Sequence, residues 1–132
     1  MVEFDRENLI ATWISIWKSG PESECFDKEY WAYEVMDNLV TYEPLRAWKL
    51  VLDILATDSS EPIVNAIGAG LVEDRLCKHG EILIDLIEFE AQNNSQLRKA
   101  LRVVDIWKED TSVYERFYSI EGVDFSNDNE IG

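Results

Sequence analysis

Apolar residues recur at helical spacing along almost the whole chain, and this periodicity limits what the chain can fold into. A first apolar face is formed near the N-terminus by Leu9, Ile10, Trp13, Ile14 and Trp17. These positions follow the i, i+3, i+4, i+7 pattern of an amphipathic helix, and no convincing alternating run typical of a strand is present. The sequence therefore predicts an all-α fold, a single compact domain of six or seven short helices arranged as a bundle or a helical-hairpin stack.

Capping and helix-breaking residues predict where several of these helices begin and end. Asp5 is a predicted N-cap, Gly20 follows the end of the first helix, and Pro44 suits the first position of a third helix. The segment 68–70 (Gly-Ala-Gly) is expected to separate two helices, with a glycine at positive φ or at a close approach of helices. The segment 79–80 (His-Gly) predicts another helix end, with His79 near the last carbonyls.

The 132 residues suit one folded domain, which we expect to span residues 1–120, followed by an acidic, frayed tail at 121–132. A hydrophobic content of 46% argues against disorder despite the high charge. The N-terminus is acidic rather than signal-like, and no apolar run is long enough to span a membrane. Cys25 and Cys77 form no paired motif, which is typical of reduced thiols. We therefore expect a cytoplasmic protein.

The charge balance excludes some classes of partner and favours another. The chain has 27 Asp and Glu against 12 Lys and Arg, a net charge of −15. Such a surface repels the phosphates of nucleic acids and anionic membranes. It attracts basic proteins over long distances, so we expect a cognate basic protein as partner, no direct nucleic acid and no membrane. Homodimerisation is left open.

The residue types give little support for catalysis. His79 is the only histidine, and with Cys25 and Cys77 it makes three N or S ligands where structural zinc requires four. An enzyme would have to use His79 with the neighbouring Glu73 and Asp74. We expect instead no catalytic residue, no cofactor and no metal.

The segment from residue 22 to residue 43 interleaves aromatic and acidic side chains. Packing in the core is the default for such aromatics, but exposed tyrosines among carboxylates suit contact with an Arg- and Lys-rich partner. The acidic pair after the glycine segment is a further candidate. The predicted partner-binding residues are Glu22, Glu24, Asp27, Glu29, Tyr30, Tyr33, Glu34, Tyr42, Glu43, Glu73 and Asp74.

One stretch resembles a known family. Residues 67–76 read Ile-Gly-Ala-Gly-Leu-Val-Glu-Asp-Arg-Leu, followed by the His-Gly step, an acidic helix ending at Ala91, and then Leu101 and Trp107. This pattern resembles a bacterial family of small helical domains of unknown function, with a Gly-x-Gly-x-x-Glu-Asp-x-Leu core and a helix that carries a Leu and a Trp, here the helix expected from Ser95 through Trp107. Small acidic proteins of this type are similar to immunity proteins encoded beside secreted bacterial toxins, which is an argument by association.

The resemblance and the charge together predict an immunity protein that neutralises a cognate, basic, nuclease-like toxin through an acidic and aromatic surface. Two alternatives remain alongside it. One is an acidic DNA-mimic inhibitor of a host or phage-defence nucleic-acid enzyme. The other is a non-catalytic adaptor subunit.

Overall fold

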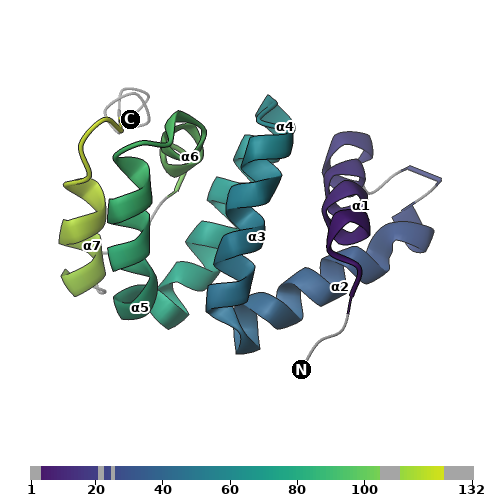
Figure 1. Ribbon diagram of the computed structural model, residues 1–132, viewed down its shortest axis with the longest axis horizontal. Coiled ribbons are helices and arrows are strands. Elements are labelled where there is room, and N and C mark those ends of the chain that lie inside the picture. The colour runs from purple at the N-terminus through teal and green to yellow at the C-terminus, as the bar shows by residue number, and fades with distance from the viewer. Residues whose placement is uncertain (1–3, 21–22, 25, 105–110, 124–132) are drawn as a thin grey trace. The chain divides into compact units, whose positions relative to one another are not determined.

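The structure is a computed structural model that describes residues 4–20, 23–24, 26–104 and 111–123. Within these ranges it describes every side chain except those of residues 74–78 and 111–112. The regular elements in this part of the chain are all helices, with no strand, so the all-α prediction is confirmed (Figure 1). Of the predicted tail, residues 124–132 lie outside the described residues, as does Trp107. The elements are α1 (Arg6–Ser19), α2 (Phe26–Tyr42), α3 (Pro44–Thr57), α4 (Glu61–Asn65), the π-helix η1 (Ala66–Val72), α5 (Glu73–Ala91), α6 (Ser95–Leu101) and α7 (Thr111–Tyr118).

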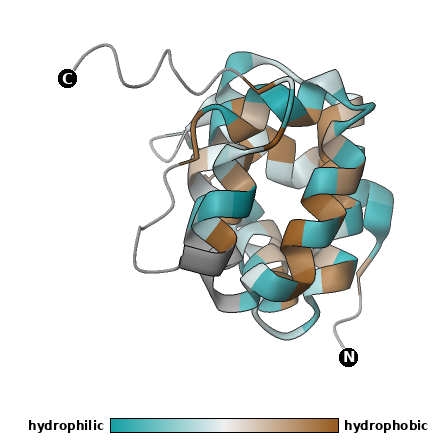
Figure 2. Ribbon diagram, turned by 90° about the vertical axis from the view of Figure 1, so that its left-hand side faces the viewer, coloured by the Kyte–Doolittle hydropathy of each residue, from teal (hydrophilic) through white to brown (hydrophobic). Residues whose placement is uncertain are grey.

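The described residues fall into two compact units, Met1–Ile63 and Val64–Gly132. In the first unit α1, α2 and α3 each pack against the other two. Each of these helices buries apolar side chains and exposes polar ones. Figure 2 shows hydrophobic and hydrophilic residues mixed along the helices of the chain, as amphipathic helices require. The side chains buried in this unit include Leu9, Trp13, Ile16, Ala32, Met36, Leu39, Val40, Leu50, Val51, Ile54 and Leu55.

Local signals in the sequence account for the ends of these three helices. The Asp5 carboxylate accepts a hydrogen bond from the Asn8 N–H at 3.1 Å, which caps the start of α1. Gly20 ends α1 at φ 84°, where its N–H donates to the Ile16 carbonyl. Pro44 occupies the first turn of α3, directly after α2. These predicted boundaries are confirmed.

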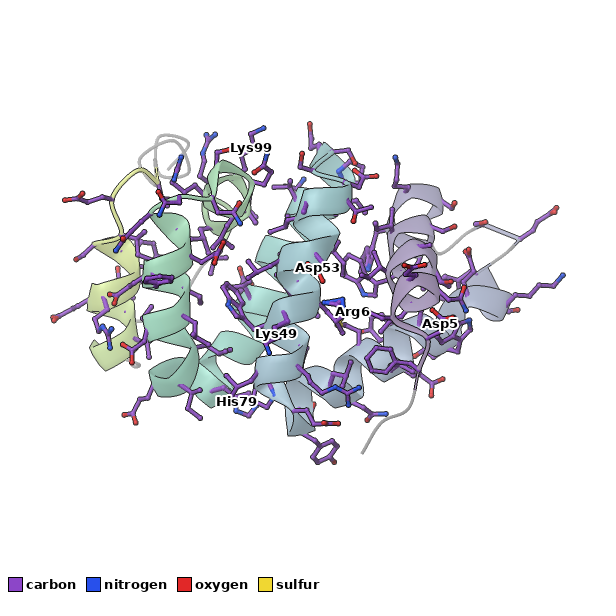
Figure 3. The ribbon with its side chains drawn as sticks, viewed as in Figure 1. Asp5, Arg6, Lys49, Asp53, His79 and Lys99 are labelled. Atoms are coloured by element: carbon purple, nitrogen blue, oxygen red, sulfur yellow. The ribbon has the colours of Figure 1, made fainter. Side chains whose placement is uncertain are left out.

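Two ion pairs connect α1 with α3 and the turn that follows it. Arg6 pairs with Asp53 of α3, and the two side chains lie toward one another in Figure 3. Lys18, in the last turn of α1, places its Nζ 3.0 Å from an Asp58 carboxylate oxygen. Both pairs are partly exposed, so they orient α1 more than they stabilise the fold.

In the second unit α5 packs against η1, α6 and α7, and η1 also packs against α6. The buried side chains of this unit include Ile67, Leu83, Ile84, Ile87, Ala91, Leu97, Leu101, Val104, Val113 and Phe117. On the exposed side of the contact between α5 and α7, Arg116 bonds to Glu88 and Asp85 of α5. These two carboxylates raise the pKa of Arg116 above its already high ordinary value.

The glycine segment does not separate two helices as predicted, because the chain stays helical through η1. Neither Gly68 nor Gly70 has a positive φ. Gly68 is instead a site of close approach, since an added Cβ would lie 2.1 Å from the Ala100 carbonyl oxygen and 2.5 Å from Val103. The expectation of close packing is thus met at Gly68, while Gly70 faces open space.

The predicted helix end at His79 and Gly80 is confirmed as a break within α5. His79 has non-helical angles (φ −127°, ψ 22°), and two helical stretches meet there at a kink. A Cβ on Gly80 would lie 2.5 Å from a Val113 methyl, so the absence of a side chain at Gly80 allows α7 to pack closely against α5. The Nε2 atom of His79 is buried and has no hydrogen-bond partner among the described residues.

We predict that Gly68→Ala lowers the free energy of unfolding by about 1–3 kcal/mol, because the new methyl meets backbone that cannot move without disturbing α6. The matched control is Gly70→Ala, which should be neutral or stabilising by up to about 1 kcal/mol, since its Cβ meets nothing within 4 Å. Urea denaturation of the two variants checks both. Equal effects at the two glycines would contradict the packing.

Asp58 lies at the C-terminal end of α3 in a set of contacts that favour its charged form. The Ser60 hydroxyl lies beside the carboxylate without the geometry of a regular hydrogen bond, and the Ser60 N–H donates to it at 2.9 Å. Together with the Lys18 ammonium, these groups lower the pKa of Asp58 from 3.8 to about 2.

A carboxyl whose pKa is lowered by folding adds stability above its unfolded pKa of about 4, and loses that contribution as the pH falls through its folded pKa. We therefore predict that Asp58→Asn unfolds more easily than the wild type at pH 6, and that the gap narrows between about pH 4 and pH 2. Urea midpoints across this range measure the gap. A gap that is constant down to pH 2 would refute the assignment, and Lys18→Gln separates the ion pair from the contribution of Ser60.

Candidate functional site

Five aromatic rings form a continuous row across α1 and α2, which we call the aromatic ladder. On α2, Phe26 and Tyr30 have ring centroids 5.6 Å apart, and Tyr30 and Tyr33 stack at 5.4 Å with an interplanar angle of 21°. The row continues onto α1, where Tyr33 lies 6.4 Å from Trp17 and Trp17 lies 5.7 Å from Trp13. The ladder arises because helical spacing places successive α2 rings on one side, next to α1.

The ladder runs from the core to the surface. Trp13 is 1% exposed, whereas Trp17 is 37% exposed, and Tyr30 and Tyr33 are each 39% exposed. Aromatic rings this accessible are typical anchors of protein interfaces, because they bury large areas at low cost in side-chain entropy. The outer rungs of the ladder are therefore available to a partner.

Carboxylates lie beside these rungs. Asp27 and Glu34 are both exposed, and they stand three residues before and four residues after Tyr30, so they share its side of α2. Lys28 is the one base among the residues of α2. The local potential at the ladder is therefore negative, which favours contact with a cation.

Glu29 differs from these exposed carboxylates. It lies three residues after Phe26 and four before Tyr33, so it shares their side of α2. The side chain is only partly exposed, and its Oε1 atom is buried with no hydrogen-bond partner among the described residues. Burying a carboxylate oxygen without a hydrogen-bond donor lowers the stability of the fold, so a donor that reached this atom would be stabilising.

The other predicted residues of the first unit are not part of the ladder. Glu24 is exposed in the turn before α2, and Tyr42 is 76% exposed at the end of α2. Glu43 is half-buried and bonds to Arg46 at 3.1 Å, so its charge is largely used within the fold. Glu22 lies outside the described residues.

Glu73 and Asp74 belong to the second unit, in the first turn of α5 as predicted. The Glu73 N–H bonds to the carbonyls of Gly68 and Gly70, because α5 follows η1 without a break. Acidic residues are favoured at a helix start because the first N–H groups there lack acceptors within the helix. The Glu73 N–H already has acceptors, so that reason does not apply at this residue. Glu73 is half-buried, and the side chain of Asp74 lies outside the described residues.

Sequence reasoning missed part of this surface. Spacing places Trp17 on the first apolar face with Trp13, yet it is exposed and extends the ladder beyond α2. On α5 of the second unit, Ile82 and Phe89 are also apolar and are 54% and 71% exposed. Spacing alone shows that residues share a side of a helix, whereas only the neighbouring helices show which of them is covered.

A separate hollow of about 600 Å³ lies in the second unit. Within it, Arg98 donates to the Ala91 carbonyl at 2.6 Å, which ties α6 to the end of α5. The position of Gly122 lies so close over Arg98 that a Cβ there would be 2.8 Å from Cδ. Arg98 therefore has a structural role in this hollow. The lining residues are Glu88, Gln92, Arg98, Ser119, Ile120, Glu121 and Gly122.

The described part of the chain offers no group of three or more His, Cys, Asp or Glu side chains arranged to hold a metal ion. Among its helices, none is both long enough and apolar enough to cross a membrane.

Comparison with known proteins places the chain in a family. A family model described as a family of unknown function, DUF6869, matches residues 19–122, which is most of the chain. The chain belongs to the DUF6869 family. Within the DUF6869 match lie α2 to α7 with the ladder residues of α2, while Trp17 of α1 precedes it. No curated protein and no solved structure matches the chain.

The charge around the ladder can be measured through Trp17. The fluorescence of Trp17 is obtained as the difference between the wild type and Trp17→Phe. We predict that, relative to free tryptophan, its quenching at low salt favours caesium over iodide by about twofold or more, because the carboxylates attract cations. High salt should reduce the difference. Trp48→Phe is the control, since Trp48 is 8% exposed. Both quenching constants are divided by those for free N-acetyltryptophanamide, because iodide is intrinsically the more efficient quencher. A caesium-to-iodide ratio at or below that of the free compound would show that the ladder is not in a negative potential.

Proposed function

We propose that this member of the DUF6869 family is a non-catalytic immunity protein, which binds a basic, nuclease-like toxin in the cytoplasm and neutralises it. The observation that carries the proposal is the exposed part of the aromatic ladder between Asp27 and Glu34, on a chain with a net charge of −15. The family itself is of unknown function, so the proposal rests on this surface and on the similarity to small acidic immunity proteins.

Inhibition would follow from competition for the site that the toxin uses for nucleic acid. A nuclease binds phosphates with Lys and Arg side chains. Carboxylates such as Asp27 and Glu34 can occupy those positions, while the outer rungs of the ladder supply apolar contact that phosphates do not. The net charge would speed the encounter, and this contribution would decrease with ionic strength.

The test begins with capture of the partner by the tagged protein at about 0.15 M salt, followed by an assay of the captured protein's own activity. The proposal expects one basic protein that degrades nucleic acid alone and is inhibited at a one-to-one ratio. A captured protein that keeps its full activity when bound would overturn the proposal and favour the adaptor. A host or phage-defence enzyme as the inhibited partner would favour the DNA mimic.

A charge-reversal pair localises the contact. We predict that Asp27→Lys combined with Glu34→Lys slows association with that partner about tenfold or more at low salt, because both steering and local contacts are lost. The matched control is Glu81→Lys combined with Glu115→Lys, which changes the net charge equally on exposed positions of α5 and α7. Surface plasmon resonance gives both rates. Equal slowing by the two pairs would place the contact elsewhere.

A further inference from the structure

We propose that the ladder and Glu29 together form a binding site for one arginine side chain of the partner. This inference rests on the proposed function, because it names the group that anchors the partner on the same surface. Two independent observations lead to it. One is the stacked pair Tyr30 and Tyr33 beside Trp17, and the other is the buried Glu29 oxygen that lacks a donor.

The chemistry of the site favours a guanidinium group. A planar guanidinium stacks on aromatic faces and donates several N–H bonds in fixed directions, whereas an ammonium is a strongly hydrated point charge. A side chain stacked on the exposed Tyr33 ring would lie near Glu29, one helical turn away on the same side of α2. Its N–H groups would then lie beside the Glu29 carboxylate, and a rotation of that side chain on binding would give Oε1 the donor that it lacks.

The chain already contains an interaction of this kind. The guanidinium carbon of Arg46 lies 4.8 Å from the centroid of the Phe4 ring while Arg46 also bonds to Glu43. This local combination of ring and carboxylate around one arginine has the same parts as the proposed site. At the ladder the ring and the carboxylate are present, and the arginine would come from the partner.

Charge complementarity determines which partner can provide it. Asp27 and Glu34 flank the site, and a second copy of this chain would bring the same negative charge toward it. The occupant is therefore an arginine on a basic protein rather than a second copy. The Asp27 and Glu34 carboxylates attract any cation, while the rings and Glu29 discriminate arginine from lysine.

The probes are two ten-residue peptides, one alternating Arg with Gly and one alternating Lys with Gly, titrated into the full chain. Binding is followed by the NMR signal of the Trp17 indole N–H, assigned with Trp17→Phe. Because the peptides carry equal charge, non-specific attraction is the same for both. We expect the Arg peptide to bind about fivefold tighter or more, in line with stacking on exposed rings. Equal affinities for the wild type would overturn the proposal.

Variants localise the preference. Glu29→Gln and Tyr33→Leu should each reduce the ratio of affinities to about one, while Tyr42→Leu, at an exposed tyrosine outside the ladder, should keep it. Glu29→Gln should also raise the melting temperature of the free chain, because it removes a buried carboxylate oxygen without a donor. This melting measurement confirms that the variant is folded. A ratio that survives in Glu29→Gln would overturn the role of Glu29.

The outcomes separate this inference from the proposed function. Inhibition of a captured toxin without any preference for the Arg peptide would leave the proposed function in place and refute the arginine site. A clear Arg preference with no inhibited partner would support the site and refute the immunity function.

Discussion

The contact between α1 and α2 is the interaction on which the candidate surface depends. Trp13 is buried, and this holds the next turn of α1 beside α2, so that Trp17 meets Tyr33 at the edge of the core. Without that contact, the row of rings would end at Tyr33 of α2 and would not continue onto α1. The same packing that stabilises the first unit thus positions the rings that we assign to a partner. Under the proposed function, stability and recognition would share one set of side chains, as they do at many interface anchors.

The negative charge at the surface is increased because several of the chain's few bases are engaged in contacts within their own unit. Arg6 pairs with Asp53, Lys18 with Asp58, and Arg46 with Glu43. Arg98 donates to the Ala91 carbonyl, and Arg116 bonds to Glu88 and Asp85. Acidic side chains such as Asp27 and Glu34 stay exposed, so the outward potential of the molecule is dominated by carboxylates.

Much of the fold could be predicted from the sequence, because local chemistry determines many helix ends. Asp5, Gly20 and Pro44 act through their own backbone and side chains, and the structure agrees with them. The glycine segment at 68–70 is harder to predict. A glycine that separates two helices and a glycine against which a neighbouring helix packs closely look the same in sequence, and at Gly68 only the approach of Ala100 distinguishes them. The residues of α2 in the candidate site were predicted, whereas the exposure of Trp17 depends on which neighbours cover it.

The ladder has two origins within the chain, and this has a consequence for how recognition can diversify. Its tyrosine rungs lie on α2, inside the matched residues 19–122, while Trp17 lies on α1, before them. A replacement at this one tryptophan would alter the row of rings and leave the sequence of α2 unchanged. Under the proposed function, the tyrosines would then supply a general affinity for cationic surfaces, and Trp17 would set which of several related partners is accepted. Such a division lets discrimination between close relatives change by single substitutions, without the cost of repacking a helix.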